Sequence, residues 1–246
     1  MTRWKAAGIH STISVAIALL VGALMFRLWY PAPYSHAAGA DQLFLLVCAG
    51  LAAGPLLTLI VFRPNKWGLK FDLVTIGILQ SAALFYGMSI VLQSRPIFLV
   101  GTLDRFDLLS DNEITDADLA QGTRPEFRSR SWTGPRLAAA VLPSSLEERN
   151  ELTSLALSGR DVQNMPRYYR AYTQARKTLL LHAKPLEILR QQKPESAPLI
   201  ASWLRTSGHA ETGVLWLPVR ARKADMVMLL DASSAVPLQA LAIDPW

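Results

Sequence analysis

The side chains that catalysis or metal binding requires are few in this sequence. Cys48 is the one cysteine among 246 residues, so neither a cysteine-pair metal site nor an intramolecular disulfide can form. The histidines are scattered, and neither histidine of the C-terminal half has a serine or an acid at a spacing typical of a catalytic triad. Asp104 with Asp107 and Glu147 with Glu148 have the composition of an acid–base pair, but exposed carboxylates are abundant. We therefore predict that the protein is not an enzyme and holds no metal or cofactor.

Basic and aromatic side chains alternate in one segment of the C-terminal half. Its members are Arg167, Tyr168, Tyr169, Arg170, Tyr172, Arg176 and Lys177. Such residues can stack with and neutralise a nucleic acid, but they can equally pack one face of a helix and leave the basic face in solvent. We favour packing and expect no nucleic-acid partner. Tyr168, Tyr169 and Tyr172, together with Asp104 and Arg105, are the candidate contact residues of this half.

Small residues gather in a long apolar segment nearer the N-terminus. Gly50 and Gly54 form a G-x-x-x-G pair, which lets another helix approach closely, and Pro55 follows directly. Because Pro55 has no N–H, the carbonyl four residues before it lacks its helical partner, and Thr58 or Gln80 is the expected donor. This face either packs within the chain or forms a groove for a partner's transmembrane helix.

Three apolar segments explain why 51% of the residues are hydrophobic and the mean hydropathy is +0.22. They lie at about 10–30, 43–62 and 72–92. A helix needs about 20 residues to cross a hydrocarbon core, so we predict three transmembrane helices within 1–94 and a separate domain at 95–246. The sequence places no ionisable side chain near the middle of these segments. A transporter or proton relay is expected to have one there, so an ion pathway is not favoured.

Basic residues flank the apolar segments on one side. They are Arg3, Lys5, Arg63, Lys66 and Lys70. Residues 31–42 contain no lysine or arginine. Because cytoplasmic loops retain basic residues, we expect the N-terminus and the link at 63–70 inside, and 95–246 outside, in the periplasm of a bacterium. Asp72 opens the third segment, where the helix dipole favours an acid.

The first apolar segment has an alternative interpretation as a cleaved signal peptide. A basic start and the small residues at 38–40 fit that interpretation. However, the apolar run is longer than a signal-peptide core, and the small residues lie well beyond its end. We predict a retained anchor, and either outcome leaves the later topology unchanged.

Residues 95–246 have the mixed composition of a soluble domain. Strand-forming residues cover 97–109 and 136–142, and a helix that bears the three tyrosines is expected to begin at Pro166. Three further strand patterns end the chain, at 214–220, 226–230 and 237–243. The predicted fold is a membrane protein with three N-terminal transmembrane α-helices, followed by an α+β periplasmic domain with a C-terminal antiparallel β-meander.

Short motifs along nearly the whole chain resemble one known family. In the membrane half they are Trp4-Lys5-Ala6, Trp29-Tyr30-Pro31, residues 54–62 and Leu69-Lys70-Phe71-Asp72-Leu73. In the other half they are Asp104-Arg105-Phe106, Gly159-Arg160-Asp161 and Pro245-Trp246. The chain resembles the TfpX/TfpZ family of type IV pilin accessory proteins. The resemblance implies an inner-membrane protein that supports pilus assembly with a cognate major pilin, and it brings no catalytic residues.

The residue patterns and the resemblance lead to one hypothesis. A pilin waits in the inner membrane as a single apolar helix with a periplasmic head, so a helper needs an intramembrane face and an exported domain. We predict a membrane chaperone or assembly modulator that holds the helix with Gly50, Gly54, Pro55 and Thr58. Its partners are the cognate pilin and the inner-membrane assembly machinery, with no small-molecule substrate. The alternatives are a periplasmic-sensing subunit of a signalling complex and a non-catalytic transporter subunit.

Overall fold

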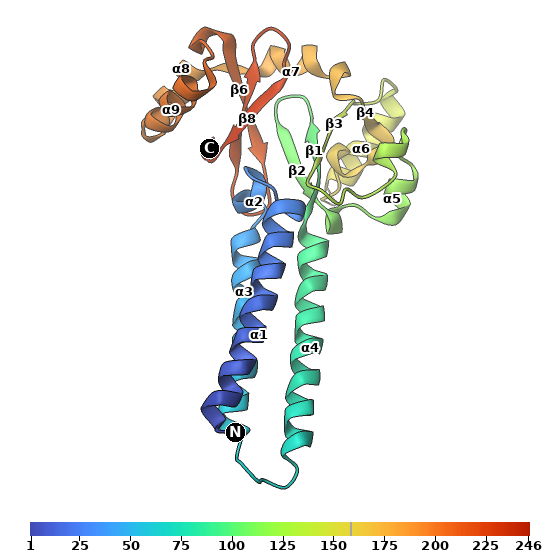
Figure 1. The fold of residues 1–246 in the computed structure, drawn as a ribbon. Coiled ribbons are helices and arrows are strands. Elements are labelled where there is room, and N and C mark those ends of the chain that lie inside the picture. The colour runs from blue at the N-terminus through green and yellow to red at the C-terminus, as the bar shows by residue number, and fades with distance from the viewer. Residues whose placement is uncertain (158) are drawn as a thin grey trace.

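The structure is a computed structural model that describes residues 1–157 and 159–246. It shows a bundle of long helices with a mixed helix and sheet domain on one end (Figure 1). The long helices are α1 (Arg3–Leu24), which continues as a π-helical segment η1 (Met25–Trp29), α3 (Ala40–Val61) and α4 (Leu69–Ser94). Each is long and apolar enough to cross a membrane. They cover the three segments that composition predicts.

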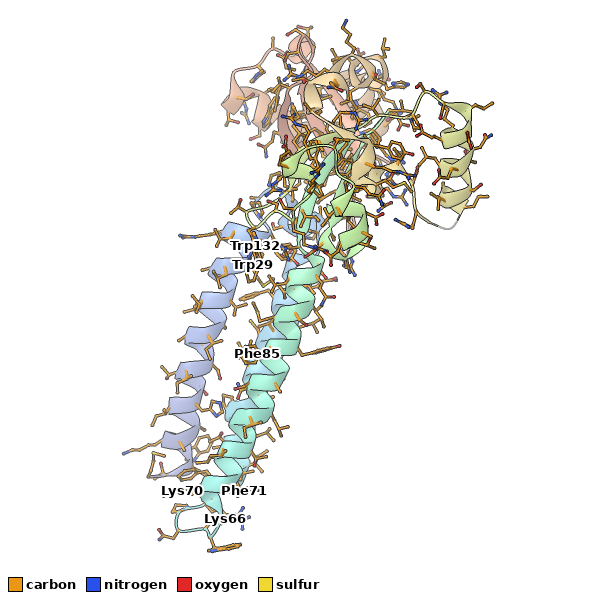
Figure 2. All side chains as sticks on the ribbon, turned by 90° about the vertical axis from the view of Figure 1, so that its right-hand side faces the viewer. Trp29, Lys66, Lys70, Phe71, Phe85 and Trp132 are labelled. Carbon is orange, nitrogen blue, oxygen red and sulfur yellow. The ribbon has the colours of Figure 1, made fainter. Side chains whose placement is uncertain are left out.

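The basic ends of the bundle lie away from the domain. In Figure 1 the N-terminus and the link between α3 and α4 are at the free end, whereas the short α2 (Tyr34–Ala37) lies against the domain. Figure 2 places Lys66 and Lys70 at the free end and Trp29 at the junction. The basic residues that flank the long helices therefore lie at the end of the bundle opposite the domain.

The domain is built on an eight-stranded mixed sheet with the order β4-β3-β1-β2-β6-β7-β8, in which β5 also pairs with β6. The strands are β1 (Pro96–Gly101), β2 (Phe106–Ser110), β3 (Arg136–Ala140), β4 (Tyr169–Arg170), β5 (Lys184–Pro185), β6 (Val214–Arg220), β7 (Met226–Asp231) and β8 (Pro237–Leu241). Strands β6, β7 and β8 pair antiparallel, as expected for a meander. The predicted C-terminal antiparallel meander is, however, part of a mixed sheet and not a purely antiparallel one, because β6 also pairs parallel with β2, and β1 pairs parallel with β3.

Two local predictions for this domain are also wrong. The expected strand at 97–109 is a hairpin, because the chain turns back where the Thr102 N–H donates to the Arg105 carbonyl at 2.9 Å. The expected helix at Pro166 is a single 3₁₀ turn, η5 (Pro166–Tyr168), followed by β4 and a second turn, η6 (Tyr172–Gln174). Pairing of Tyr169 with Ala140 draws this segment into the sheet edge.

Helices lie beside both lateral ends of the sheet, the β4 end and the β8 end (Figure 1). They are α5 (Asp116–Ala120), α6 (Leu146–Leu157), α7 (Arg176–His182), α8 (Leu186–Gln192) and α9 (Ala197–Ser207). The 3₁₀ turns between them include η2 (Asp111–Glu113), η3 (Pro125–Phe127), η4 (Val162–Asn164), η7 (Pro194–Ser196) and η8 (Glu211–Gly213). The capping box at Ser145 begins α6 as predicted, since the Glu148 N–H donates to the Ser145 hydroxyl at 3.2 Å.

The connection between α4 and β1 is a single buried residue. Arg95 alone separates α4 from β1, and it is 3% exposed. Its guanidinium forms an ion pair with Asp111 at 2.8 Å and donates to the Ser131 carbonyl at 3.3 Å. The ring of Trp132 covers it, with 4.9 Å between the guanidinium carbon and the ring centre. A buried charge with this many partners holds the end of α4 and the start of the sheet in one geometry.

A second set of contacts joins the segment between α1 and α3 to α4 and to the domain. Tyr30 is fully buried, and its hydroxyl donates to the Val91 carbonyl of α4 at 2.6 Å. The Lys223 N–H donates to the Ala37 carbonyl at 2.9 Å. One hydrophobic core runs without a break from the upper bundle into the sheet. The domain is thus anchored to the helices at several points and has no flexible linker to them.

Arg95→Ala should destabilise the whole protein, because it removes one of the two arginines, Arg95 and Arg130, that form ion pairs with the buried Asp111. Since Arg130 still compensates the carboxylate, we expect a loss of about 1–3 kcal/mol, below the cost of a buried charge without any partner. The matched control is Arg124→Ala, which breaks the exposed pair with Glu126 and should cost less than about 1 kcal/mol. Thermal unfolding of detergent-purified protein measures both effects. Equal shifts in Tm for the two variants would contradict the role assigned to the junction.

Candidate functional site

A polar cluster joins the three long helices through one side chain, Gln80 of α4. Its amide nitrogen donates to the Leu51 carbonyl of α3 at 3.1 Å and to the Ser14 hydroxyl of α1 at 3.3 Å. Its amide oxygen lies 2.8 Å from Nε2 of His10, and Nδ1 of His10 lies 2.7 Å from the Thr58 hydroxyl. In an apolar environment such interhelical hydrogen bonds fix how the helices pack.

Pro55 explains why the cluster forms where it does. The helix cannot supply an N–H at Pro55, so the Leu51 carbonyl needs another donor, and Gln80 provides it. Thr58, the other donor expected from the sequence, binds His10 instead. If the amide oxygen of Gln80 is the acceptor, His10 donates through Nε2 and accepts the Thr58 hydroxyl proton at Nδ1.

Sequence reasoning missed His10, although a signal for it exists. His10 and Ser14 are four residues apart, which places them on one face of α1, and both contact Gln80. They supply the polar groups of α1 in the cluster, and Thr58 and Gln80 supply those of α3 and α4.

The two glycines of the G-x-x-x-G pair have different surroundings. A Cβ atom on Gly54 would lie 1.6 Å from the Gln80 amide oxygen, so a glycine is needed there for Gln80 to enter the cluster. A Cβ atom on Gly50 would meet no described atom within 4 Å. Gly54 therefore serves packing within the chain, whereas Gly50 faces open space.

That open space is an apolar groove of about 270 Å³ between α3 and α4. It is lined among others by Leu43, Leu46, Val47, Gly50, Gly87 and Ile90. Because α3 begins and α4 ends at the domain, these residues place the groove in the half of the bundle nearer the sheet. Leu46 on its rim is 69% exposed, so the groove is open at its side. Such a surface can accept apolar side chains of another helix.

The candidate contact residues of the domain do not form one exposed surface. Tyr168, Tyr169 and Tyr172 are all buried, and burial raises the pKa of Tyr169 well above its ordinary value. The sequence pattern misleads here because these rings pack into the core from 3₁₀ turns and an edge strand. Asp104 is exposed in the hairpin turn, and Arg105 lies between Asp104 and Asp107, at 3.5 and 3.4 Å from their carboxylates.

The remaining predicted residues lie at the free end of the bundle. Lys66 forms an ion pair with Asp72 at 2.6 Å, across the start of α4. In the part of the chain that the structure describes, no group of three or more His, Cys, Asp or Glu side chains could hold a metal ion.

Comparison with known proteins identifies the family. A family model described as "Fimbrial assembly protein FimB" matches residues 1–39, which include His10 and the whole of α1. The "Fimbrial assembly protein, serogroup I" of Dichelobacter nodosus is 36% identical over 186 residues, covering 74% of this chain and 72% of that relative. The chain belongs to the family of fimbrial assembly proteins.

Two further fimbrial assembly proteins of Dichelobacter nodosus are similar to the chain. The serogroup E1 protein is 36% identical over 186 residues, with 74% of this chain and 72% of that protein covered. The protein of serogroups C1 and C2 is 37% identical over 121 residues, which is 48% of this chain and 92% of that protein. No solved structure matches the chain. The fimbrial part of the resemblance seen in the sequence is thereby supported, and the narrower TfpX/TfpZ name stays a prediction.

Gly54→Ala should loosen the bundle, because the new methyl group displaces Gln80 and breaks its bonds to His10 and Leu51. We expect a loss of about 1–3 kcal/mol, the usual cost of a disrupted buried network. Gly50→Ala is the matched control and should not lower stability, because its methyl group meets no neighbour and alanine favours a helix over glycine by up to about 1 kcal/mol. Thermal unfolding in detergent compares the two, and a Gly50 variant as unstable as the Gly54 variant would refute the distinction.

Proposed function

We propose that this fimbrial assembly protein is an inner-membrane accessory protein that holds a type IV pilin by its apolar helix, as a chaperone or assembly modulator. The observation that carries the proposal is the open groove beside Gly50. The names of the relatives supply the fimbrial context. The groove adds a place where a single helix can be received.

The chemistry of the groove suits a transmembrane helix. Lipid is as apolar as leucine, so helices associate in a bilayer through close packing and hydrogen bonds. Gly50 on α3 and Gly87 on α4 lack side chains, and the apolar residues between them offer no charge that a pilin helix would have to neutralise. Gln80, the one strongly polar side chain beside the groove, is already hydrogen-bonded within the bundle.

The charge pattern supports a topology for the proposal, and the junction at Arg95 supports a fixed position of the domain. We place the basic free end in the cytoplasm and the sheet domain in the periplasm, following the tendency of basic residues to stay inside. The contacts of His10 with α3 and α4 support a retained first helix, since cleavage would remove part of the cluster. A domain anchored at Arg95 then meets the pilin head at a fixed height above the groove.

Photocrosslinking in cells tests the groove. A photoreactive residue at Leu46 should capture the pilin, whereas the same residue at Leu19, which is 70% exposed on α1, should capture at least about tenfold less. Gly50→Leu should lower capture from Leu46 because its side chain fills the groove. Membrane insertion and expression should stay unchanged. Equal capture from both positions, or no effect of Gly50→Leu, would remove the groove from the proposal.

Reporter fusions test the topology. Alkaline phosphatase folds and is active only in the periplasm, so a fusion after Trp246 should be active and a fusion in the link at residue 66 should be inactive. A reporter that requires the cytoplasm should give the opposite pattern. Activity of the cytoplasmic reporter at Trp246 would overturn the periplasmic placement of the domain.

A further inference from the structure

A second cavity, in the sheet domain, has a composition unlike that of the membrane groove. Its volume is about 460 Å³, and its lining is mainly polar. The polar and charged residues that line it include Asp107, Glu113, Asp161, Gln163, Asn164 and Arg220. They come from β2, from the turns η2 and η4 with the residue before η4, and from the end of β6. Nothing in the proposed handling of a pilin helix uses this cavity.

Asp107 is the residue that makes the cavity unusual. It is 3% exposed, and its Oδ1 atom lies 3.4 Å from Nε of Arg105. Its Oδ2 atom is buried and has no hydrogen-bond partner among residues 1–157 and 159–246. A buried carboxylate oxygen without a partner is costly, so its presence in a residue that lines a cavity points to a donor that the described residues do not supply.

Gln163 presents a second acceptor of the same kind. Its side-chain oxygen is buried and also lacks a partner among the residues that the structure describes. The residue is held in place through its backbone carbonyl, which accepts the hydroxyl of Tyr169. The two residues that carry these acceptors therefore line one cavity, Asp107 from strand β2 and Gln163 from the turn η4.

A basic side chain, Arg220, also lines the cavity. Arg220 is the register partner of Asp107 on the parallel strand β6, so both side chains lie on one face of the sheet. Arg220 is exposed, and its guanidinium has no ion pair with any described residue. The cavity thus combines buried acceptors with an available cation at its edge.

We propose that this cavity binds an ammonium or guanidinium group whose carrier also presents an acceptor, such as a carboxylate or a peptide carbonyl. The cation donates to Asp107 and Gln163, and the acceptor faces Arg220. Cations of this type carry several N–H donors, and a guanidinium directs its donors in a planar fork. The two sources of such a group are a free amino acid and a basic side chain of a partner protein.

The electrostatics of Asp107 give binding a pH dependence. Burial, with a smaller contribution from Asp161, raises the pKa of Asp107 to about 6, while Arg105 and Arg220 oppose the rise. Glu113 and Arg222 also line the cavity, and the buried Tyr169 senses the charge of Asp107. Below pH about 6 the free carboxyl is protonated and loses its attraction for a cation. Affinity should therefore fall as the pH drops through this value.

Calorimetric titration of the full chain in detergent, with two probes, tests the proposal. L-arginine represents a free amino acid, and Nα-acetyl-L-arginine methylamide represents a side chain within a protein. At pH about 7.5 at least one probe should bind, and Asp107→Asn should weaken its binding by about tenfold or more. Glu147→Gln is the control for loss of an exposed carboxylate and should bind as the unmodified protein does.

The pattern of binding separates the outcomes. Arg220→Gln should weaken binding of L-arginine more than that of the blocked probe, because only the former has a carboxylate. Preference for one probe identifies the source of the group. Asp107→Asn preserves shape and removes a buried charge, so its Tm at neutral pH should not fall, which excludes misfolding. Absence of binding by both probes, or equal binding by the Asp107 variant, would overturn the proposal.

Discussion

The buried ion pair between Arg95 and Asp111 is the constraint on which the arrangement of this protein depends. A guanidinium at the end of an apolar helix is tolerated only with an anion and further acceptors beside it, and the first turn after β2 supplies the anion. The carbonyl of Arg95 in turn accepts the Asp111 N–H at 3.0 Å. The pair thereby joins α4, β1 and β2 and determines where the helix stops and the sheet begins.

Within the bundle, Gln80 has the corresponding role. It satisfies the carbonyl that Pro55 leaves free, and it ties α1 to the other two helices through His10 and Ser14. Because these groups satisfy each other, the polar cluster is closed and offers little to a partner. The neighbouring groove is apolar and lacks side chains at its glycines. One part of the bundle thus holds the three helices together, whereas the groove beside it has an open side.

Local signals in the sequence predict local structure well. Apolar length located the three helices, Ser145 marked the start of α6, and Pro55 pointed to Gln80 as a donor. Features that depend on distant residues could not be predicted this way. The parallel pairing of Phe106 with Val219 joins residues from opposite ends of the domain, so it made an expected meander part of a mixed sheet. The turn before Phe106, at 102–105, contains neither glycine nor proline, so the sequence carries no signal that divides the strand pattern there. Burial of the tyrosines likewise emerges only from packing, and the spacing of His10 and Ser14 places both on one face of α1 without indicating their partners.

The length of α4 has a consequence for where the sheet begins. Its 26 residues span about 39 Å, whereas the hydrocarbon core of a bilayer is about 30 Å thick. The apolar part of the helix, at 72–92, is about 32 Å long and matches such a core, so the polar residues at the two ends of α4 extend beyond it. Since Arg95 alone separates α4 from β1, the first strand starts immediately after the last of these polar residues. In a bilayer the sheet would therefore start at the level of the lipid headgroups.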